Sequence, residues 1–251
     1  MTEPLSADRN GGDTAVIIPA ANEADRIAAT VKAAAALPGV DLVVVVDDGS
    51  ADQTGRVARA AGARVVRHSR NRGKAAAMET GAEAVRLLDE DATPRHLLFL
   101  DADLGETAQA AAPLIEPVRQ GTADMTIAVF TTRVKLGGHG LVVRLSKEGI
   151  RRATGFDPAQ PLNGQRCLSR AAFEAARPLA HGFGVETALT IDLLRKGYRV
   201  AEVEVDMSHR ATGTDLRAQL HRARQLRDVA RALAVREPLV VQNLDRLRPK
   251  R

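Results

Sequence analysis

The stretch HLLFLDAD, from His96 to Asp103, joins an apolar run to two carboxylates. The apolar run predicts a buried strand, and Asp101 and Asp103 follow where that strand ends. At about 4 Å and an effective dielectric constant of about 20, two like charges repel by roughly 4 kcal/mol, so the pair needs a cation, a shared proton or basic neighbours. Oxygen ligands favour Mg²⁺ or Mn²⁺, which proteins usually hold with one or two carboxylates and substrate phosphates. A turn in which the Asp side chains cap their own backbone is the alternative.

Strands and helices are predicted to alternate on both sides of this stretch. Further apolar runs predict strands at Thr14 to Ile18, Leu42 to Val46, Ala63 to Arg67 and Asp124 to Val129. Alanine-rich segments with helical spacing predict helices at Ala24 to Ala36, Ala51 to Ala61, Gly73 to Leu88 and Ala108 to Arg119. Asp52, Thr54 and Gly62 supply boundary signals for the second of these helices. The alternation predicts an α/β fold with a mostly parallel central sheet and helices on both faces.

Polar clusters follow three of the predicted strands, at Pro19 to Glu23, Asp47 to Ser50 and Asp101 to Asp103. Ligands of such sheets gather beyond the carboxyl ends of the strands, so this convergence predicts a ligand site at one edge of the sheet. In the alternative, Asp48 and Gly49 form a turn and Ser50 starts the next helix, which leaves the second carboxylate unexplained.

A basic segment, Arg70 to Lys74, follows the third predicted strand and opens a helix. Its cations and free backbone N–H groups could face a diphosphate, and Gly73 permits a close approach. A solvated basic turn is the alternative. No G-x-x-x-x-G-K-[ST] or G-x-G-x-x-G motif lies at a strand-to-helix junction, which disfavours P-loop and dinucleotide-binding folds.

Composition narrows the class of protein. With 251 residues and 45% apolar content, the chain can bury one substantial core. Lys and Arg total 36 against 31 Asp and Glu, and the net charge of +5 suits phosphate-bearing ligands or an anionic surface. Aromatic residues make up only 2% and no zinc-finger or helix-turn-helix pattern stands out, so nucleic acid is not an expected partner. The lone Cys167 excludes an internal disulfide and favours a reducing compartment.

The chain carries no recognisable targeting signal. Met1 to Asp13 is polar, and no run approaches the roughly 18 apolar residues that span a bilayer. We expect a cytoplasmic protein that would touch a membrane only as a peripheral protein on its inner face. The expected organisation is a flexible tail at 1–13, a single domain at 14–236 and a basic tail at 237–251.

Four motifs together resemble a known family. VIIPAANE (Val16 to Glu23), VVVDDGSADQT (Val44 to Thr54), RNRGKAAAM (Arg70 to Met78) and FLDADLG (Phe99 to Gly105) have the order and spacing of family 2 glycosyltransferases of the GT-A fold, which use nucleotide-diphosphate sugars. Dolichyl-phosphate mannose synthases and glucosyl-3-phosphoglycerate synthases are of this type. The resemblance implies that residues 14–130 form the half that binds the donor.

The resemblance also implies roles for single residues of that half. Pro19, Ala21 and Glu23 would line the nucleotide pocket, and Asp48 would bind the base with Asp47 beside it. Lys74 would lie near the base or the phosphates. Asp101 would sit on the ribose side, and Asp103 would hold the metal and serve catalysis.

Residues 131–236 would form the acceptor half. NGQRCLSR (Asn163 to Arg170) and HGFGVETALTIDLLRKGYRVAEVEVDMSHRATG (His181 to Gly213) resemble glucosyl-3-phosphoglycerate synthase-like members. By that resemblance Glu186 is catalytic, because it would lie near the reacting sugar and could orient or deprotonate an acceptor hydroxyl, and His209 would complete the metal shell. The alternatives are a Glu that the helix dipole favours in a first turn, and an exposed loop imidazole.

The resemblance implies a glycosyltransferase that uses Mg²⁺ or Mn²⁺ and a UDP- or GDP-linked sugar. The acceptor stays open between a polyprenyl phosphate, a small phosphorylated acid and another sugar, and so does inversion versus retention. A sugar-phosphate nucleotidyltransferase is one alternative, although its G-x-G-T-R-type loop is replaced by Pro19 to Glu23. A nucleotide-sugar-binding protein without turnover is the other.

Two segments of the second half have open roles. Residues 129–161 are rich in Gly, Arg and Lys, and could form a flap over the donor, a seat for an anionic acceptor or a solvated loop. Asp215 to Arg236 has the pattern of an amphipathic basic helix. Such a helix can rest on anionic lipid, or it can pack on the domain or on a second copy in a homodimer.

Overall fold

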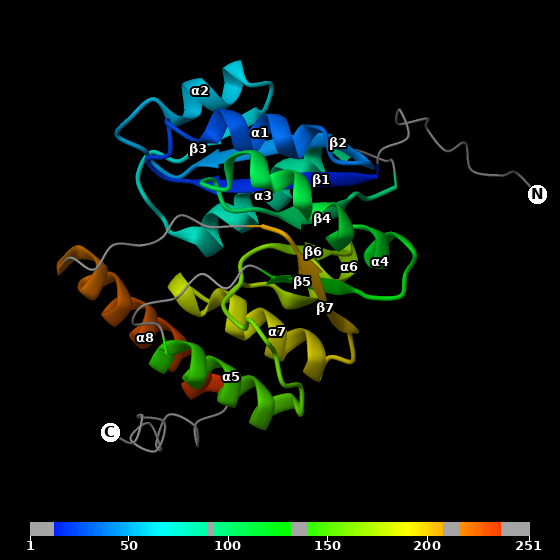
Figure 1. Cartoon of the computed structure of the whole chain (residues 1–251), viewed down its shortest axis with the longest axis vertical. Helices are drawn as coiled ribbons and strands as arrows, with labels where there is room; N and C mark the ends of the chain where they lie inside the picture. The colour runs from blue at the N-terminus through cyan, green and yellow to red at the C-terminus, as the bar shows by residue number, and fades with distance from the viewer. Residues whose placement is uncertain (1–12, 90–92, 132–139, 208–215, 237–251) are drawn as a thin grey trace, which may run out of the picture.

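The central sheet has seven strands in the order β3-β2-β1-β4-β6-β5-β7. The computed structural model describes residues 13–89, 93–131, 140–207 and 216–236 (Figure 1). The strands are β1 (Thr14–Ala20), β2 (Val40–Asp47), β3 (Arg64–Arg67), β4 (His96–Phe99), β5 (Met125–Phe130), β6 (Arg166–Leu168) and β7 (Val200–Val205). The predicted strands of the first half are confirmed, with small shifts of their ends.

The sheet is mostly parallel, as the unbroken apolar strands predict. Only the pairs β4–β6 and β5–β6 are antiparallel. The sequence does not predict β6, because its three residues are too few to show a period. Since β6 runs against its neighbours, its amino end meets the carboxyl ends of the other strands at one edge, which we call the rim.

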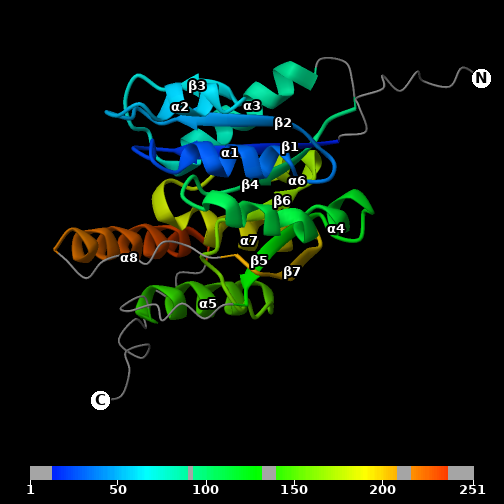
Figure 2. The same cartoon turned by 45° about the horizontal axis from the view of Figure 1, so that its top comes forward.

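Helices cover both faces of the sheet (Figures 1 and 2). The helices are α1 (Ile27–Ala35), α2 (Thr54–Ala60), α3 (Lys74–Asp89), α4 (Glu116–Arg119), α5 (Gly140–Thr154), α6 (Arg170–Ala176), α7 (Val185–Arg195) and α8 (Leu216–Arg236), with 3₁₀ helices η1 (Gly105–Leu114) and η2 (Gly182–Gly184). Successive residues of β1 point to opposite faces, so Val16 and Ile18 join a core with α1, α2 and η1. Ile17 lies in a second core with α3, α6 and α7.

The helix predicted at Ala108 to Arg119 is wrong as a single α-helix. The chain forms the 3₁₀ helix η1 and then the short α4. Pro113 lies inside η1 and Pro117 near the start of α4. Because proline lacks a backbone N–H and clashes with the preceding turn, a continuous α-helix is unfavourable here.

A third apolar cluster joins α5, α7 and α8, and α5 and α8 lie side by side beyond α7 (Figure 2). Val229 and Leu233 of α8 are fully buried in it, as are Leu145 and Ile150 of α5. The apolar side of α8 therefore packs on the domain, which is one of the alternatives that the sequence leaves open. Residues 140–154 form a helix rather than a flap or loop, while 132–139 lie outside the described residues.

The expected tails lie almost entirely outside the described residues, and the division of the chain into a donor half and an acceptor half stays a prediction. Among the helices that the structure describes, none is both long enough and apolar enough to cross a membrane.

Candidate active site

The motifs that follow β1 and β2 are tied to each other at the rim. Asn22 donates its backbone N–H to Ser50 Oγ at 3.0 Å, and Asn22 Oδ1 accepts from the backbone N–H of Ala51 at 2.8 Å. The N–H of Glu23 donates to Thr54 Oγ1 at 2.8 Å. Asn22 has a φ of 60°, a conformation that Asn adopts more readily than most residues. The polar side chains of these loops thus fix the loops, while Ala21 is exposed and Pro19 and Glu23 are half-buried.

Asp47 points into the protein and not toward a ligand. Its side chain is 0% exposed, and Oδ1 accepts from the N–H of Ser50 at 2.9 Å. Its Oδ2 lies 3.6 Å from Arg67 Nε. Asp47 therefore holds the turn after β2, in line with the alternative that this segment forms a turn. Its buried position does not support a contact with the base.

Asp48 organises the basic segment that follows β3. Its Oδ1 accepts from the N–H of Arg72 at 2.8 Å and lies 2.7 Å from His68 Nδ1, and its Oδ2 accepts from the N–H of Gly73 at 2.8 Å. The other ring nitrogen of His68 lies 2.9 Å from Thr80 Oγ1. Asp48 and His68 thus hold the entry to α3, and with it Lys74, at the rim.

Lys74 joins the predicted donor and acceptor sides. Its Nζ lies 2.9 Å from Asp101 Oδ1 and 2.9 Å from Glu186 Oε1. Burial alone would lower the pKa of Lys74, but the charges of Asp101 and Glu186 outweigh it and hold the pKa above its usual value. Lys74 is therefore a cation between two carboxylates that come from distant parts of the sequence.

Gln165, at the amino end of β6, fixes Asp101. Gln165 Nε2 donates to Asp101 Oδ2 and the backbone N–H of Asp101 donates to Gln165 Oε1, both at 2.9 Å. The preceding Gly164 passes so close that a Cβ there would lie 2.3 Å from Lys74 Nζ. Neither residue is predicted as a site residue from the sequence, because the place of both at the rim depends on the unpredicted antiparallel strand β6.

Asp103 lies half-buried in the turn after β4, and α1 fixes the backbone of this turn. Arg26 Nη1 donates to the carbonyl of Asp103 at 3.0 Å, and Thr30 Oγ1 donates to the carbonyl of Ala102 at 2.8 Å. These contacts engage the backbone of the Asp-Ala-Asp turn.

The described residues contain no group of three or more His, Cys, Asp or Glu side chains that would hold a metal by themselves. The carboxylate of Asp103 at the rim, with that of Asp101 two residues before it, fits an ion that is held jointly with substrate phosphates, as Mg²⁺ usually is. His209, the other predicted ligand, lies outside the described residues.

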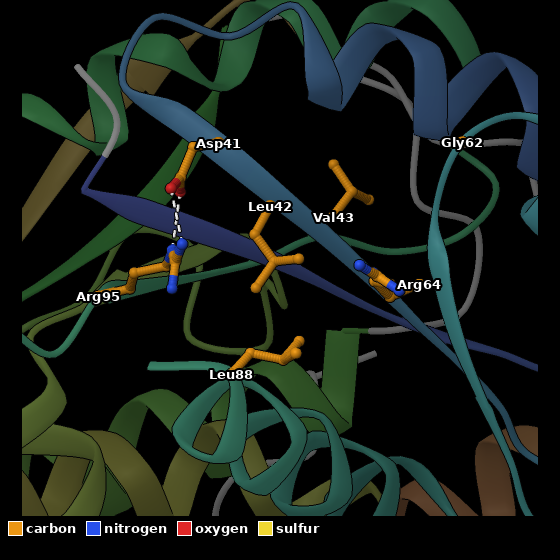
Figure 3. A pocket seen from close by; sticks show the side chains of 7 residues that line it. All are labelled: Asp41, Leu42, Val43, Gly62, Arg64, Leu88 and Arg95. Atoms are coloured by element: carbon orange, nitrogen blue, oxygen red, sulfur yellow. Dashed lines mark hydrogen bonds and ion pairs between the residues drawn. The ribbon is translucent and has the colours of Figure 1, made fainter. Parts of the chain in front are cut away.

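A shallow hollow of about 340 Å³ lies at the other end of the strands (Figure 3). It is lined by Asp41, Leu42, Val43, Gly62, Arg64, Leu88 and Arg95. Asp41 and Arg95 form an ion pair at 2.7 Å across it, and Arg95 also pairs with Asp89. Its residues lie in or next to the amino-terminal parts of β2, β3 and β4 and near the carboxyl end of α3, so it is not part of the rim.

Comparisons with known proteins identify the family to which the chain belongs. The family model "Glycosyl transferase family 2" matches residues 15–160. Glycosyltransferase AglJ of Haloferax volcanii is 29% identical over 204 residues, which are 80% of this chain and 64% of AglJ. Glucosyl-3-phosphoglycerate synthase of Mycobacterium tuberculosis is 28% identical over 223 residues, 82% of this chain and 68% of that protein. The chain thus spans about two thirds of the length of these relatives.

Solved structures resemble the whole fold. The crystal structure of the Mycobacterium tuberculosis glucosyl-3-phosphoglycerate synthase in complex with Mn²⁺, UDP and phosphoglyceric acid has a TM-score of 0.73 and 26% identity. The match covers 92% of this chain and 80% of that one. A further complex of that synthase holds Mn²⁺, UDP-glucose and phosphoglyceric acid, with a TM-score of 0.73 and 27% identity over 92% of this chain and 81% of that one.

Proposed function

We propose, because this chain belongs to glycosyl transferase family 2, that it transfers a sugar from a nucleotide-diphosphate sugar to an acceptor that is a small phosphorylated acid, a polyprenyl phosphate or another sugar, with Mg²⁺ or Mn²⁺ as cofactor. The observation that carries the proposal is the position of Lys74 at the rim, 2.9 Å from both Asp101 and Glu186. This cation lies between the carboxylates proposed for the donor and the acceptor, where it can stabilise the charge that develops during transfer between two positioned substrates.

In the reaction, the bond between the anomeric carbon and the donor's phosphate oxygen breaks, and a bond from that carbon to the acceptor oxygen forms. The leaving nucleoside diphosphate gains negative charge, which Lys74 and the amino end of α3 stabilise. Asp103 and His209 would hold the metal together with the donor phosphates, and the ion would further neutralise that charge.

The donor pocket is proposed along Pro19, Ala21 and Glu23, with Asp48 at the base and Asp101 at the ribose. A carboxylate offers about four lone-pair positions, and His68, Arg72 and Gly73 use three of those of Asp48. The remaining position on Oδ2 is an acceptor, which favours a base with a ring N–H, as uracil and guanine have. A UDP-linked donor is tested first, because relatives of similar fold hold UDP or UDP-glucose.

Glu186 is proposed to orient the acceptor or to take its proton. It is only 7% exposed and lies in the first turn of α7, where the rim faces the acceptor half. A hydroxyl acceptor in an inverting reaction needs such a base, whereas an ionised phosphate acceptor needs none. A small phosphorylated acid is the first acceptor to test, since the related synthases hold phosphoglyceric acid. Polyprenyl phosphate and a free sugar follow.

The test is a panel of UDP-, GDP-, ADP- and TDP-sugars with and without Mn²⁺, measured first as a shift in melting temperature and then as turnover with each acceptor. Release of nucleoside diphosphate with formation of a glycoside supports the proposal. Formation of pyrophosphate from a nucleoside triphosphate and a sugar phosphate would identify a nucleotidyltransferase. Donor binding without any turnover would identify a binding protein.

A peripheral membrane contact is proposed only through charge. The apolar side of α8 is covered by α5 and α7, but Arg224 and Arg231 are exposed on the other side. These cations can bind anionic lipid headgroups at the cytoplasmic face of the membrane without insertion of the helix. Flotation with vesicles that contain anionic lipid, compared with neutral vesicles and with Arg224→Gln/Arg231→Gln, tests this contact. A concentration-dependent mass in solution would instead assign the surface to a homodimer.

A further inference from the structure

Arg166 is a buried cation in the middle of the sheet. It begins β6, between β4 and β5, and is 1% exposed. Within the described part of the chain, no ion pair includes Arg166. Burial lowers the pKa of Arg166 to about 10, so the guanidinium stays charged at neutral pH. Removing a cation from water costs free energy, and an apolar side chain of similar size would fill the same space without that cost.

The guanidinium bonds to two segments that are far apart in sequence. Nε donates to the carbonyl of Asn163 at 2.9 Å and Nη2 to the carbonyl of Pro161 at 3.1 Å. Nη1 donates to the carbonyl of Glu186 at 3.1 Å and to Thr190 Oγ1 at 2.8 Å. Arg166 thus joins the loop 161–165 to the first turns of α7, through backbone carbonyls of both segments and the hydroxyl of Thr190.

Each of these segments carries one side of the candidate site. The loop carries Gly164, which lies against Lys74, and Gln165, which holds Asp101. The first turn of α7 carries Glu186, which binds Lys74 from the other side. Lys74 bridges Asp101 and Glu186. The separation of these two carboxylates therefore depends on how the loop and the helix are fixed to each other.

We propose that Arg166 is a positioning residue that sets the separation between Asp101 and Glu186 by fixing the loop 161–165 to the first turn of α7. The proposal rests on the proposed function, since it assigns Glu186 a role in transfer. Arg166 contacts backbone carbonyls, Thr190 Oγ1 and, at 3.9 Å, Met125 Sδ, so it acts on the reaction only through Glu186 and the loop.

The test compares Arg166→Met, Arg166→Lys and Glu186→Gln with the double variant Arg166→Met/Glu186→Gln. Arg166→Met should lower kcat by about 10- to 100-fold, because a misplacement of about 1 Å can cost that much. Arg166→Lys, which keeps the charge but not the fork of donors, should fall between Arg166→Met and the wild type. The losses in the double variant should be less than additive, because the position of Glu186 no longer matters once its carboxylate is gone, while the effect through the loop remains.

Arg170→Met is the matched control. Arg170 is also largely buried, but it bonds to the carbonyl of Ala82 at 3.0 Å and pairs with Asp89 at 3.3 Å, away from the rim. Arg170→Met should lower the melting temperature and leave kcat within about twofold of the wild-type value. Additive losses in the Arg166 and Glu186 double variant would overturn the positioning role.

Hydrogen exchange of the amides in 162–165 and 186–190 gives a readout that does not need turnover. Exchange should increase in both segments of Arg166→Met and stay unchanged in the Arg170→Met control. If the wild type transfers no sugar, the proposed function fails and exchange alone decides whether Arg166 joins the two segments. Unchanged exchange in both segments would reject the inference, whatever the activity. If Arg166→Met does not fold, Arg166→Lys takes its place in both measurements.

Discussion

Single side chains at the rim divide into those that fix the loops and those left for a ligand. Asp47, Ser50 and Thr54 have buried or partly buried hydrogen bonds that hold the turn after β2 and tie it to the loop after β1. Lys74 and Glu186 instead meet at the rim, where Lys74 is partly exposed. Adjacent residues of one motif therefore have different functions, and substitutions should separate stability from ligand binding.

Asp103→Ala should abolish the metal-dependent part of donor binding, because it removes the carboxylate proposed to hold the ion. Donor binding is measured by calorimetry with and without Mn²⁺. The melting temperature should change little, since Asp103 is partly exposed and a surface change usually alters stability by less than about 0.5 kcal/mol. Asp157→Ala, which removes an exposed partner of Lys147, is the control. A variant that keeps full activity with Mn²⁺ would falsify the metal role of Asp103.

Gly164→Ala should lower the rate of sugar transfer strongly and the stability of the fold only slightly. The added Cβ would lie 2.3 Å from Lys74 Nζ and 3.2 Å from Asp101 Oδ1, so Lys74 must move. The end of a lysine moves at little cost, but a displaced cation should slow transfer by about tenfold or more. Gly140→Ala, where a Cβ meets nothing within 4 Å, is the control. Equal kcat values for the two variants would show that the position of Lys74 does not limit the reaction.

Loops and helices depend on close approaches that only glycine allows. Gly49 has a φ of 71°, and a Cβ there would lie 2.5 Å from the backbone carbon of Arg70. The turn after β2 thus touches the backbone of the basic segment after β3, next to the bonds that Asp48 makes. At the far end of the molecule, Gly149 of α5 lets Leu233 of α8 approach.

Gly49→Ala should lower both stability and donor affinity. A residue forced into this backbone region costs about 1–3 kcal/mol, and here the clash is with backbone that has no freedom to rotate away. Gly62→Ala isolates the cost of placing alanine in a backbone conformation with positive φ, since Gly62 has a φ of 104° and nothing lies within 4 Å of its Cβ position. Urea unfolding and donor titration of the two variants compare them. The same donor affinity in both would mean that the contact with Arg70 does not shape the pocket.

Leu233→Ala and Gly149→Ala should partly compensate each other. Leu233→Ala leaves a cavity and should cost about 2–5 kcal/mol, whereas Gly149→Ala overpacks the same space and should cost about 1–3 kcal/mol. A Cβ at position 149 would lie 2.3 Å from Leu233 Cδ2, so the new methyl group occupies part of the cavity. The double variant should therefore be more stable than the sum of the single losses implies. Additivity in urea unfolding would show that α5 and α8 do not pack as described.

The sheet contains strands from both halves of the chain. Contacts at the amino ends of these strands, such as those of His96, contribute to its stability. His96 begins β4, and its backbone N–H donates to the carbonyl of Asp13 at 2.9 Å. Burial lowers the pKa of His96, and Arg119 lowers it too, against the opposing effect of Asp13. The folded protein therefore favours the neutral imidazole.

Stability should fall as the pH drops below about 6.5, the pKa of an unfolded histidine. Between that pH and the lower pKa of folded His96, the unfolded chain binds more protons, so the free energy of unfolding rises with pH and decreases on acidification. His96→Gln should lose less stability than the wild type between pH 7.5 and pH 5.5 in urea unfolding. The opposite order would mean that the folded protein prefers the charged form. The window avoids the titration of most carboxylates.

The sequence alone determined the order of strands and helices in the first half, the mostly parallel sheet and the family of the chain. Hydrophobic periods and strand-end motifs are local, so VIIPAANE, DDGS and DAD could be placed at one edge before any contact was known. The prolines of η1 and α4 are local as well, and giving them weight would have prevented the prediction of one continuous helix.

The tertiary structure alone decided which polar residues of these motifs are buried within the loops and which meet at the rim. Asp47 and Asp48 are adjacent, yet the packing of Gly55 and Arg67 places Asp47 inside, while Asp48 holds the entry to α3. Gln165 reaches Asp101 across 64 residues because β6 runs antiparallel, and Arg166 then fixes Glu186 beside Lys74. Contacts between residues so far apart are set by strand order and direction, and no local period of the sequence encodes them.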